Sequence, residues 1–191
     1  MANTVTNVTT GKPSINGAIW RAPYGTTLPA SVTDALAEAY KCLGYCSDDG
    51  LTNGNAPSSE TIKAWGGDAV LEPTTGRVDT FAWKAIEAMN VDVLKMVYGD
   101  SNVSGNLDSG ITVRANSEEL AAAVYVIDTV MKGGVLKRTV IPNGKMTNLE
   151  DIVYKDNQAV GYGVTISAMS GGFGAGDSDT HKEYIKKPAA T

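Results

Sequence analysis

The chain has 191 residues, a net charge of −5 and 42% hydrophobic side chains, which is enough apolar material to bury a core. The acidic balance argues against a protein that grips nucleic acid, because such binding depends on clustered Lys and Arg side chains that neutralise phosphates. No apolar run approaches the roughly 18 residues that a membrane span needs, and the segment after Met1 lacks the basic start and apolar core of a signal peptide. We therefore expect a chain that is cytoplasmic or is assembled from the cytoplasm.

The 21 glycines stand mostly between short runs rich in Val, Thr and Ile, a pattern that favours a β-rich protein with many turns. Residues 1–16 are polar, Thr-rich and without period, so we expect an extended N-terminal arm. A first strand is predicted over residues 17–23, where alternation ends at Pro23. Residues 33–39 begin with a capping pair and are predicted to form a short helix.

The sequence KCLGYCS, residues 41–47, is predicted to be a second strand that ends before the turn signal Asp49-Gly50. On one strand Cys42 and Cys46 would lie about 13 Å apart at ~3.3 Å per residue, which is too far for a disulfide, so we expect free thiols. With a single histidine in the chain they cannot complete a four-ligand zinc site, and we expect no metal. The polar sequence TNGNAPSS, residues 52–59, is predicted to be a loop.

Residues 60–87 are predicted to form two or three strands. The sequence from Pro73 to Gly76, PTTG, supplies a turn signal, and Phe81, Trp83 and Ala85 share one face of the return strand.

The clearest helix signal follows. Asn90 can cap the helix, Asp92 suits its first turn and Gly99 suits the position after its end. The apolar face between them consists of Val91, Leu94, Val97 and Tyr98. We expect this short helix to plug an open edge or face of a sheet.

Residues 100–110 are predicted to be a loop and residues 110–116 a strand. Ser117 and the glutamates after it could cap a helix through Ala123. We favour a strand from Leu120 to Met131 instead, because β-forming residues alternate there.

A Pro-Asn-Gly sequence interrupts the next alternating stretches. Residues 135–142 are predicted to be a strand, Asn143-Gly144 a hairpin turn, and residues 158–170 another strand. Residues 171–191 are Gly-rich and then charged, which indicates a C-terminal arm. Neither terminal arm has enough apolar surface to bury alone, so we expect both to be mobile in an isolated subunit and to become ordered against a partner.

Two short motifs could indicate chemistry. The sequence GDSN, residues 99–102, is similar to the nucleophile block of a lipase-like hydrolase, but such a serine needs a base, and the only histidine, His181, lies in the polar tail. GGFGAG, residues 171–176, follows a strand as a dinucleotide fingerprint does, but no helix follows to meet a phosphate. We therefore expect neither an enzyme nor a cofactor.

Five blocks within residues 17–170 carry a family likeness: GAIWRAPYGTTLP, LGYCSDDGLT, IKAWGGDAV, LKMVYGDSNV and KRTVIPNGKMTNLEDIVYKDNQAVGYGVTISA. In this order they resemble the major tail tube protein of long-tailed, non-contractile bacteriophages. IKAWGGD together with the last block is the most specific part of the resemblance.

The resemblance implies a mainly β domain over residues 17–170, with two packed antiparallel sheets in a sandwich or barrel and a short flanking helix, between terminal arms at residues 1–16 and 171–191. It implies hexameric rings that stack into a hollow tube in the virion, where each subunit lends a sheet to a closed barrel and DNA passes to the host without specific binding. The implied partners are other copies of the chain, a tape-measure protein and tail terminator or tip proteins, with no membrane binding. A bacterial secretion-system tube protein and a virion-decorating β-sandwich binding module are the alternatives.

Residues 48–80 are expected to make contacts between subunits of such a tube. Trp65, beside Gly66 and Gly67, which allow close backbone approach, is the candidate anchor of an interface. The candidate lumen residues are Asp68, Glu72 and Asp79. Acidic side chains repel phosphate within a Debye length of roughly 8–10 Å, although the same charges would equally suit an outer, solvated edge.

Overall fold

The computed structural model describes residues 3–174 and 176–187 and is mainly β, which confirms the predicted fold class. Nine strands form one antiparallel sheet whose main path is β3-β2-β10-β11-β12-β7-β4, with β1 beside β10 and β13 beside β11. The bounds of these strands are β1 Gly11–Pro13, β2 Ile19–Pro23, β3 Lys41–Cys42, β4 Cys46–Ser59, β7 Thr74–Ala85, β10 Ala123–Met131, β11 Leu136–Leu149, β12 Tyr162–Ala168 and β13 Lys182–Lys186.

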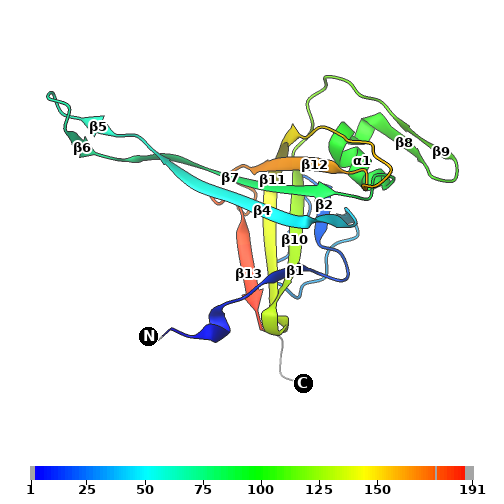
Figure 1. Ribbon diagram of the computed structural model, residues 1–191, viewed down its shortest axis with the longest axis horizontal. Helices are drawn as coiled ribbons and strands as arrows, with labels where there is room; N and C mark the ends of the chain where they lie inside the picture. Colours follow the sequence, from blue (N-terminus) through cyan, green and yellow to red (C-terminus); the bar gives the residue numbers. More distant parts are fainter. Residues whose placement is uncertain (1–2, 175, 188–191) are drawn as a thin grey trace.

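The main sheet folds into two layers that are joined through β11, and Figure 1 shows β4, β7 and β12 running across β10 and β13. The first half of β11 pairs with β13 and its second half pairs with β12, so one long strand belongs to both layers. The facing sides bury one large apolar cluster that includes Ile19, Phe81, Trp83, Tyr125 and Ile166. The described residues form no closed barrel, so the sheet keeps open edges.

The α-helix α1, Val91–Tyr98, lies where the sequence predicts it. The side chain of Asn90 accepts a hydrogen bond from the backbone N–H of Asp92 (2.9 Å), which satisfies one of the free donors at a helix start. Leu94 and its buried neighbours on the helix join the large apolar cluster. The helix therefore closes one end of the space between the layers (Figure 1).

A smaller apolar cluster, built on Val124, Val126 and Val140, occupies the other side of β10 and β11. Two stretches of chain cover it: the segment between β2 and β3, through Leu28 and Leu36, and the C-terminal region, through Phe173 and Tyr184. Both faces of β10 are thus buried, which explains why its burial is continuous over Ala123 to Ile127 rather than alternating.

The helix predicted over residues 33–39 is wrong, because this stretch forms turns. The guanidinium of Arg138 donates to the backbone carbonyl oxygens of Ser31 (3.2 Å) and Asp34 (2.7 Å). A helix would use the second of these carbonyls for its own hydrogen bond. The contact with the sheet therefore replaces the local helix.

The hairpin turn predicted at Asn143-Gly144 is also wrong, because β11 continues through both residues. Gly144 is paired with Ala123 on one side and with Ala168 on the other, and its φ is not positive. A Cβ at this position would lie 2.7 Å from the ring of Tyr125, so the glycine serves close packing rather than a turn.

The predicted strand over residues 41–47 is interrupted. Gly44 has a φ of +71°, and a Cβ there would collide with the carboxyl group of Glu87. The chain therefore leaves β3 and begins β4 as a separate strand.

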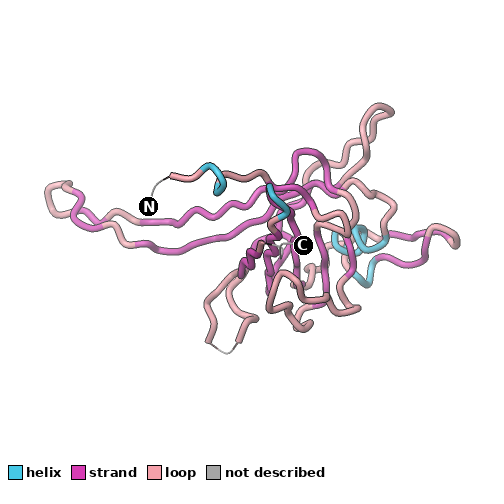
Figure 2. The backbone as a smooth tube through the Cα atoms, turned by 90° about the horizontal axis from the view of Figure 1, so that it is seen from below, coloured by secondary structure: helices cyan, strands magenta, loops and turns pink. Residues whose placement is uncertain are grey.

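β4 and β7 continue beyond the body as one long hairpin, which we call the β-arm and define as residues 52–78 (Figures 1 and 2). The predicted loop over residues 52–59 is wrong, because these residues lie in β4. The PTTG turn is wrong as well, because Thr74 to Gly76 pair with Ser58 and Ser59. The short strands β5 Ile62–Lys63 and β6 Ala69–Leu71 pair near the tip, and the real turn lies between them.

The loop predicted over residues 100–110 contains structure of its own. A 3-10 turn, η2 Asp100–Asn102, leads into a hairpin of β8 Val103–Asn106 and β9 Gly110–Val113. The favoured strand over Leu120 to Met131 is confirmed from Ala123 onwards.

Both terminal arms contribute a strand to the main sheet. In the N-terminal arm, a 3-10 turn, η1 Val5–Asn7, is followed by β1, which pairs with β10. In the C-terminal arm, β13 pairs with the beginning of β11, which follows another 3-10 turn, η3 Lys132–Gly134. None of the helices in residues 3–174 and 176–187 is long and apolar enough to cross a membrane.

Candidate assembly surfaces

The β-arm projects from the body, and no other segment within residues 3–174 and 176–187 packs on either of its faces (Figures 1 and 2). Every residue from 55 to 78 is exposed. Its polar and Gly-rich sequence suits this position, because a strand with water on both faces needs no apolar alternation. A two-stranded hairpin of this kind is at best marginally stable alone. The β-arm therefore gains from contact with another molecule.

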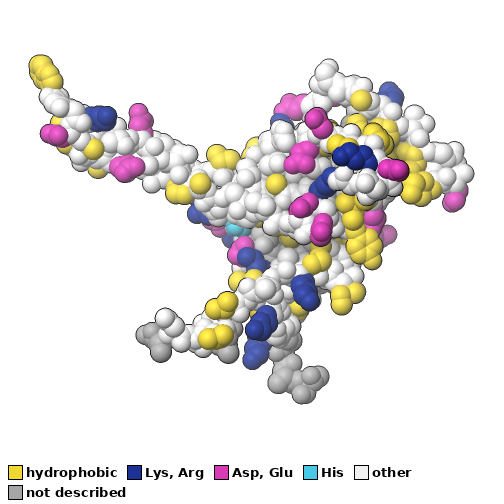
Figure 3. Space-filling view, in the orientation of Figure 1, with side chains coloured by type: hydrophobic (Ala, Val, Ile, Leu, Met, Phe, Trp, Pro, Cys, Tyr) yellow, Lys and Arg dark blue, Asp and Glu magenta, His cyan; other side chains and the backbone are white. Residues whose placement is uncertain are grey.

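The tip of the β-arm presents Trp65 to solvent. The backbone N–H groups of Gly66 (2.8 Å) and Gly67 (3.0 Å) both donate to the carbonyl oxygen of Ala64, and this tight turn places the indole with a relative exposure of 106%. Yellow apolar atoms at the end of the arm are visible in Figure 3. A fully exposed tryptophan is unfavourable in water and is common in interfaces.

Further exposed apolar side chains line the β-arm behind Trp65. They are Ile62, Val70, Leu71 and Val78. Ile62 and Leu71 are paired across β5 and β6, and exposed apolar side chains gathered on a projecting element favour an interaction site there. These four residues are not among the site residues predicted from the sequence, although isolated apolar side chains within a polar stretch of this length are a readable signal.

The three candidate lumen residues do not lie together. Asp68 and Glu72 are exposed near the tip of the β-arm, where the carboxylate of Glu72 accepts a hydrogen bond from the hydroxyl of Ser59 (2.8 Å). Asp79 has a relative exposure of 1% and is bound by side chains of this chain. A carboxylate in that position offers no surface to DNA, so the expectation that Asp79 lines a lumen is wrong.

The open edges of the sheet form a second candidate surface. In the part of the chain that the structure describes, β4 and β3 end the strand path, and β13 pairs only with β11. Free backbone N–H and C=O groups on an edge can pair with another chain. Pro57 lies on the β4 edge and removes one donor there, which limits unspecific pairing.

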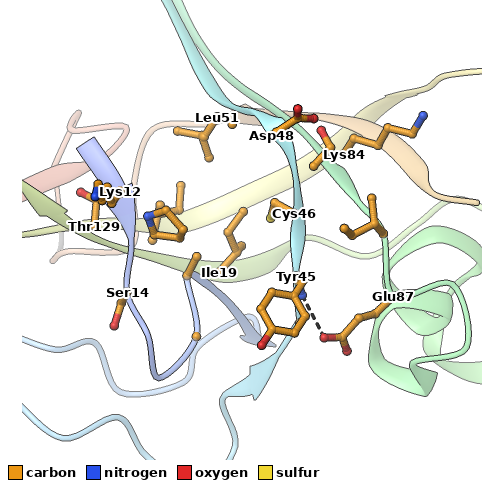
Figure 4. Close-up of a pocket in the computed structure, with 18 of the residues that line it drawn as sticks. Lys12, Ser14, Ile19, Tyr45, Cys46, Asp48, Leu51, Lys84, Glu87 and Thr129 are labelled. Carbon is orange, nitrogen blue, oxygen red and sulfur yellow. Dashed lines mark hydrogen bonds between the residues drawn. The ribbon is translucent and has the colours of Figure 1, made fainter. Parts of the chain in front are cut away.

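A hollow of about 1200 Å³ opens between the chain leading from β1 to β2 and the beginning of β4 (Figure 4). Ile19, Cys46 and Leu51 give it an apolar lining, and Lys84 and Glu87 are among its polar groups. The backbone N–H of Tyr45 donates to the Glu87 carboxylate (3.0 Å), which holds one wall in place. Burial first, and then nearby Cys42 and Glu87, raise the pKa of the Cys46 thiol to about 11, which makes it a poor nucleophile at neutral pH.

We expect both cysteines to remain thiols in the purified protein, and both are free in the structure. Because the pKa of Cys46 is raised to about 11, its alkylation by iodoacetamide at pH 8 should be slow in the folded chain and should accelerate in urea. Intact mass spectrometry with and without urea measures both rates. A mass two hydrogens lower under non-reducing conditions would show a disulfide and contradict this prediction.

Comparison with known protein families gives one match over nearly the whole chain. The model of a family described as phage tail tube protein matches residues 4–187. The match includes the β-arm and both strands contributed by the terminal arms. Comparison with curated proteins gave no match. The family match agrees with the β-rich fold, its open edges and its projecting arm, and the chain belongs to the phage tail tube protein family.

Proposed function

We propose that this chain is the tube subunit of a long-tailed, non-contractile phage and that its copies form hexameric rings, which stack into a channel for DNA delivery. The β-arm is the observation that carries the proposal. Residues 55–78 are all exposed, and the tip ends in Trp65 with 106% exposure. A long two-stranded hairpin with an apolar tip is marginally stable and poorly solvated in an isolated subunit, so its exposure favours contact with other subunits.

The arrangement of the contact surfaces favours a polymer over a closed dimer. We infer that the tip of the β-arm contacts the body of a neighbouring copy rather than a second tip, in which case the two surfaces in contact are different. Such head-to-tail contacts generate rings or helical filaments rather than symmetric pairs. Pairing between the open edges of neighbouring subunits would remove those edges and line the channel with strands.

Electron microscopy of the concentrated, purified chain tests the proposal. We expect rings with sixfold symmetry or tubes with a central channel. A small oligomer at all concentrations would instead indicate a virion-decorating binding module. Tubes that form only when a secretion-system protein is added, and not with phage tail proteins, would indicate a bacterial secretion-system tube protein.

The channel lining is a further part of the proposal. Asp68 and Glu72 are exposed and acidic, and either the lumen or the outer surface could hold them. A helical reconstruction of the tube locates both side chains. The role in the lumen fails if they lie on the outside or if the channel is lined mainly by Lys and Arg. A tape-measure protein inside the tube and terminator or tip proteins at its ends are the expected partners.

A further inference from the structure

Asp79 occupies the point where β7 leaves the body and becomes the β-arm. Its neighbour in the arm, Val78, has a relative exposure of 61%, whereas Asp79 has 1%. Phe81, two residues further into the body on the same face of the strand, belongs to the large apolar cluster. A buried carboxylate beside an apolar core costs free energy unless it is fully hydrogen-bonded.

The hydrogen bonds to Asp79 come from two distant parts of the chain. Its Oδ1 accepts from Nε of Arg77 (3.0 Å), which belongs to the β-arm. Its Oδ2 accepts from the hydroxyl of Thr180 and from Nδ1 of His181 (3.2 Å), which lie more than 100 residues later. The two oxygens thus serve two different segments. An amide has one oxygen and cannot accept on both sides.

The C-terminal segment is ordered around this contact. The imidazole of His181 meets the ring of Phe81 edge to face, with 5.3 Å between the centroids. Directly after His181, β13 begins and pairs with β11. On the other side, Lys182 bridges Asp177 and Asp179 at 3.4 Å each and lies over the ring of Phe173 (4.1 Å). These contacts hold residues 177–186 as one unit against the end of the body.

We propose that Asp79 is a positioning residue that fastens residues 177–186 to the root of the β-arm, so that the direction of the arm and the seating of β13 are set together. β4 and β7 pair with each other along the arm, and no other strand in the described part of the chain pairs with them beyond the body. Without the contact from the C-terminal segment, the root of the arm is free to bend. With it, the arm tip is held at a fixed place relative to the sheet edges.

The charge of Asp79 makes this contact sensitive to acid. Burial raises the pKa of Asp79, but the hydrogen bonds from Thr180 and Arg77 and the charges of Arg77 and His181 outweigh it, so the pKa lies below its ordinary value. Among the described residues, Asp179 and Glu183 are the other charged groups that line the hollow shared by Arg77, Asp79 and His181. Because the pKa of Asp79 is lower in the folded chain, the contact stabilises the fold fully above the unfolded-state pKa of about 4. This stabilisation is lost as the pH falls from there through the lower pKa of the folded chain. We therefore expect the fastening to persist at neutral pH.

Hydrogen exchange of the full-length protein tests the fastening without reference to assembly. In Asp79→Asn at pH 7, peptides from residues 177–186 and from β7 around residue 79 should exchange about tenfold faster. This factor corresponds to the loss of a hydrogen bond to a charged group. Asp156→Asn is the matched control, because it makes the same chemical change on an exposed side chain outside the β-arm and outside residues 177–186, and its exchange should stay near that of the natural chain. His181→Phe keeps an aromatic ring beside Phe81 and removes the N–H donor, so it should also speed exchange. Unchanged exchange in Asp79→Asn, or equal acceleration throughout β12, would overturn the proposal.

The single histidine of the chain supplies a second readout. In the natural chain, the NMR signals of the His181 imidazole should show an inflection below about pH 4, when Asp79 is protonated. The inflection should vanish in Asp79→Asn. Its persistence there would mean that another group titrates beside His181, which contradicts the assigned pairing.

The consequence for assembly rests on the proposed function. If the arm must be held in position, Asp79→Asn should form fewer rings or tubes at pH 7 than Asp156→Asn. Failure of the natural chain to assemble would count against the proposed function and leave the exchange result intact. Normal assembly of Asp79→Asn with a loosened C-terminal segment would show that Asp79 does not position the arm.

Discussion

Replacing Arg138 by alanine is expected to lower the free energy of unfolding by about 3 kcal/mol. The guanidinium forms two hydrogen bonds with the carboxylate of Asp128 (2.7 and 2.9 Å) and also holds the carbonyl oxygens of Ser31 and Asp34. Its removal leaves a largely buried carboxylate without a partner and releases the segment that covers the smaller apolar cluster. Urea unfolding followed by tryptophan fluorescence measures the loss.

Lys137 provides the matched control for this prediction, because it is the preceding residue on β11 and pairs with Glu183 near the surface. Lys137→Ala should cost no more than about 1 kcal/mol, as exposed ion pairs do. Arg138→Met, which keeps much of the volume, should remain strongly destabilised, since Asp128 stays unpaired. A loss below about 1 kcal/mol in Arg138→Ala would show that the ion pair contributes little more than a surface pair.

Trp65→Ala is expected to raise the protein concentration needed for assembly roughly thirtyfold, which corresponds to about 2 kcal/mol for an interface tryptophan. The prediction follows from the proposed tube, in which the arm tip is buried against another copy. Folding should be unaffected, because a side chain with 106% exposure contributes little to the isolated subunit. Sedimentation across a concentration series, together with urea unfolding, separates the two effects.

Tyr154→Ala serves as the comparison, since Tyr154 is also a strongly exposed aromatic residue but lies outside the β-arm. It should assemble like the natural chain, and Trp65→Phe should fall between the two. Equal assembly of Trp65→Ala and the natural chain would remove Trp65 from the interface. Equal loss in both alanine variants would indicate a general effect of surface aromatic residues.

Elements whose signals are local can be predicted from the sequence. The alternation of Phe81, Trp83 and Ala85 predicts the buried half of β7, because side chains on a strand point to opposite faces in turn. Asn90 and Gly99 mark the ends of α1, because capping depends on residues within one turn of the helix end. The ordered sequence blocks also indicate the family, which the match over residues 4–187 confirms.

Elements that depend on partners far away in the sequence became visible only in the folded chain. Asn143-Gly144 has the composition of a turn, but pairing on both sides and the ring of Tyr125 keep it within β11. The polar residues 52–59 have the composition of a loop, but β7 supplies the hydrogen-bond partners that make them a strand. An aspartate such as Asp79 is expected on the surface. Its carboxylate is buried because it binds Thr180 and His181, which lie about a hundred residues later in the sequence. The type of a residue indicates its local conformational preference and its preference for water. Pairing with distant segments determines which of these preferences are satisfied in the folded chain.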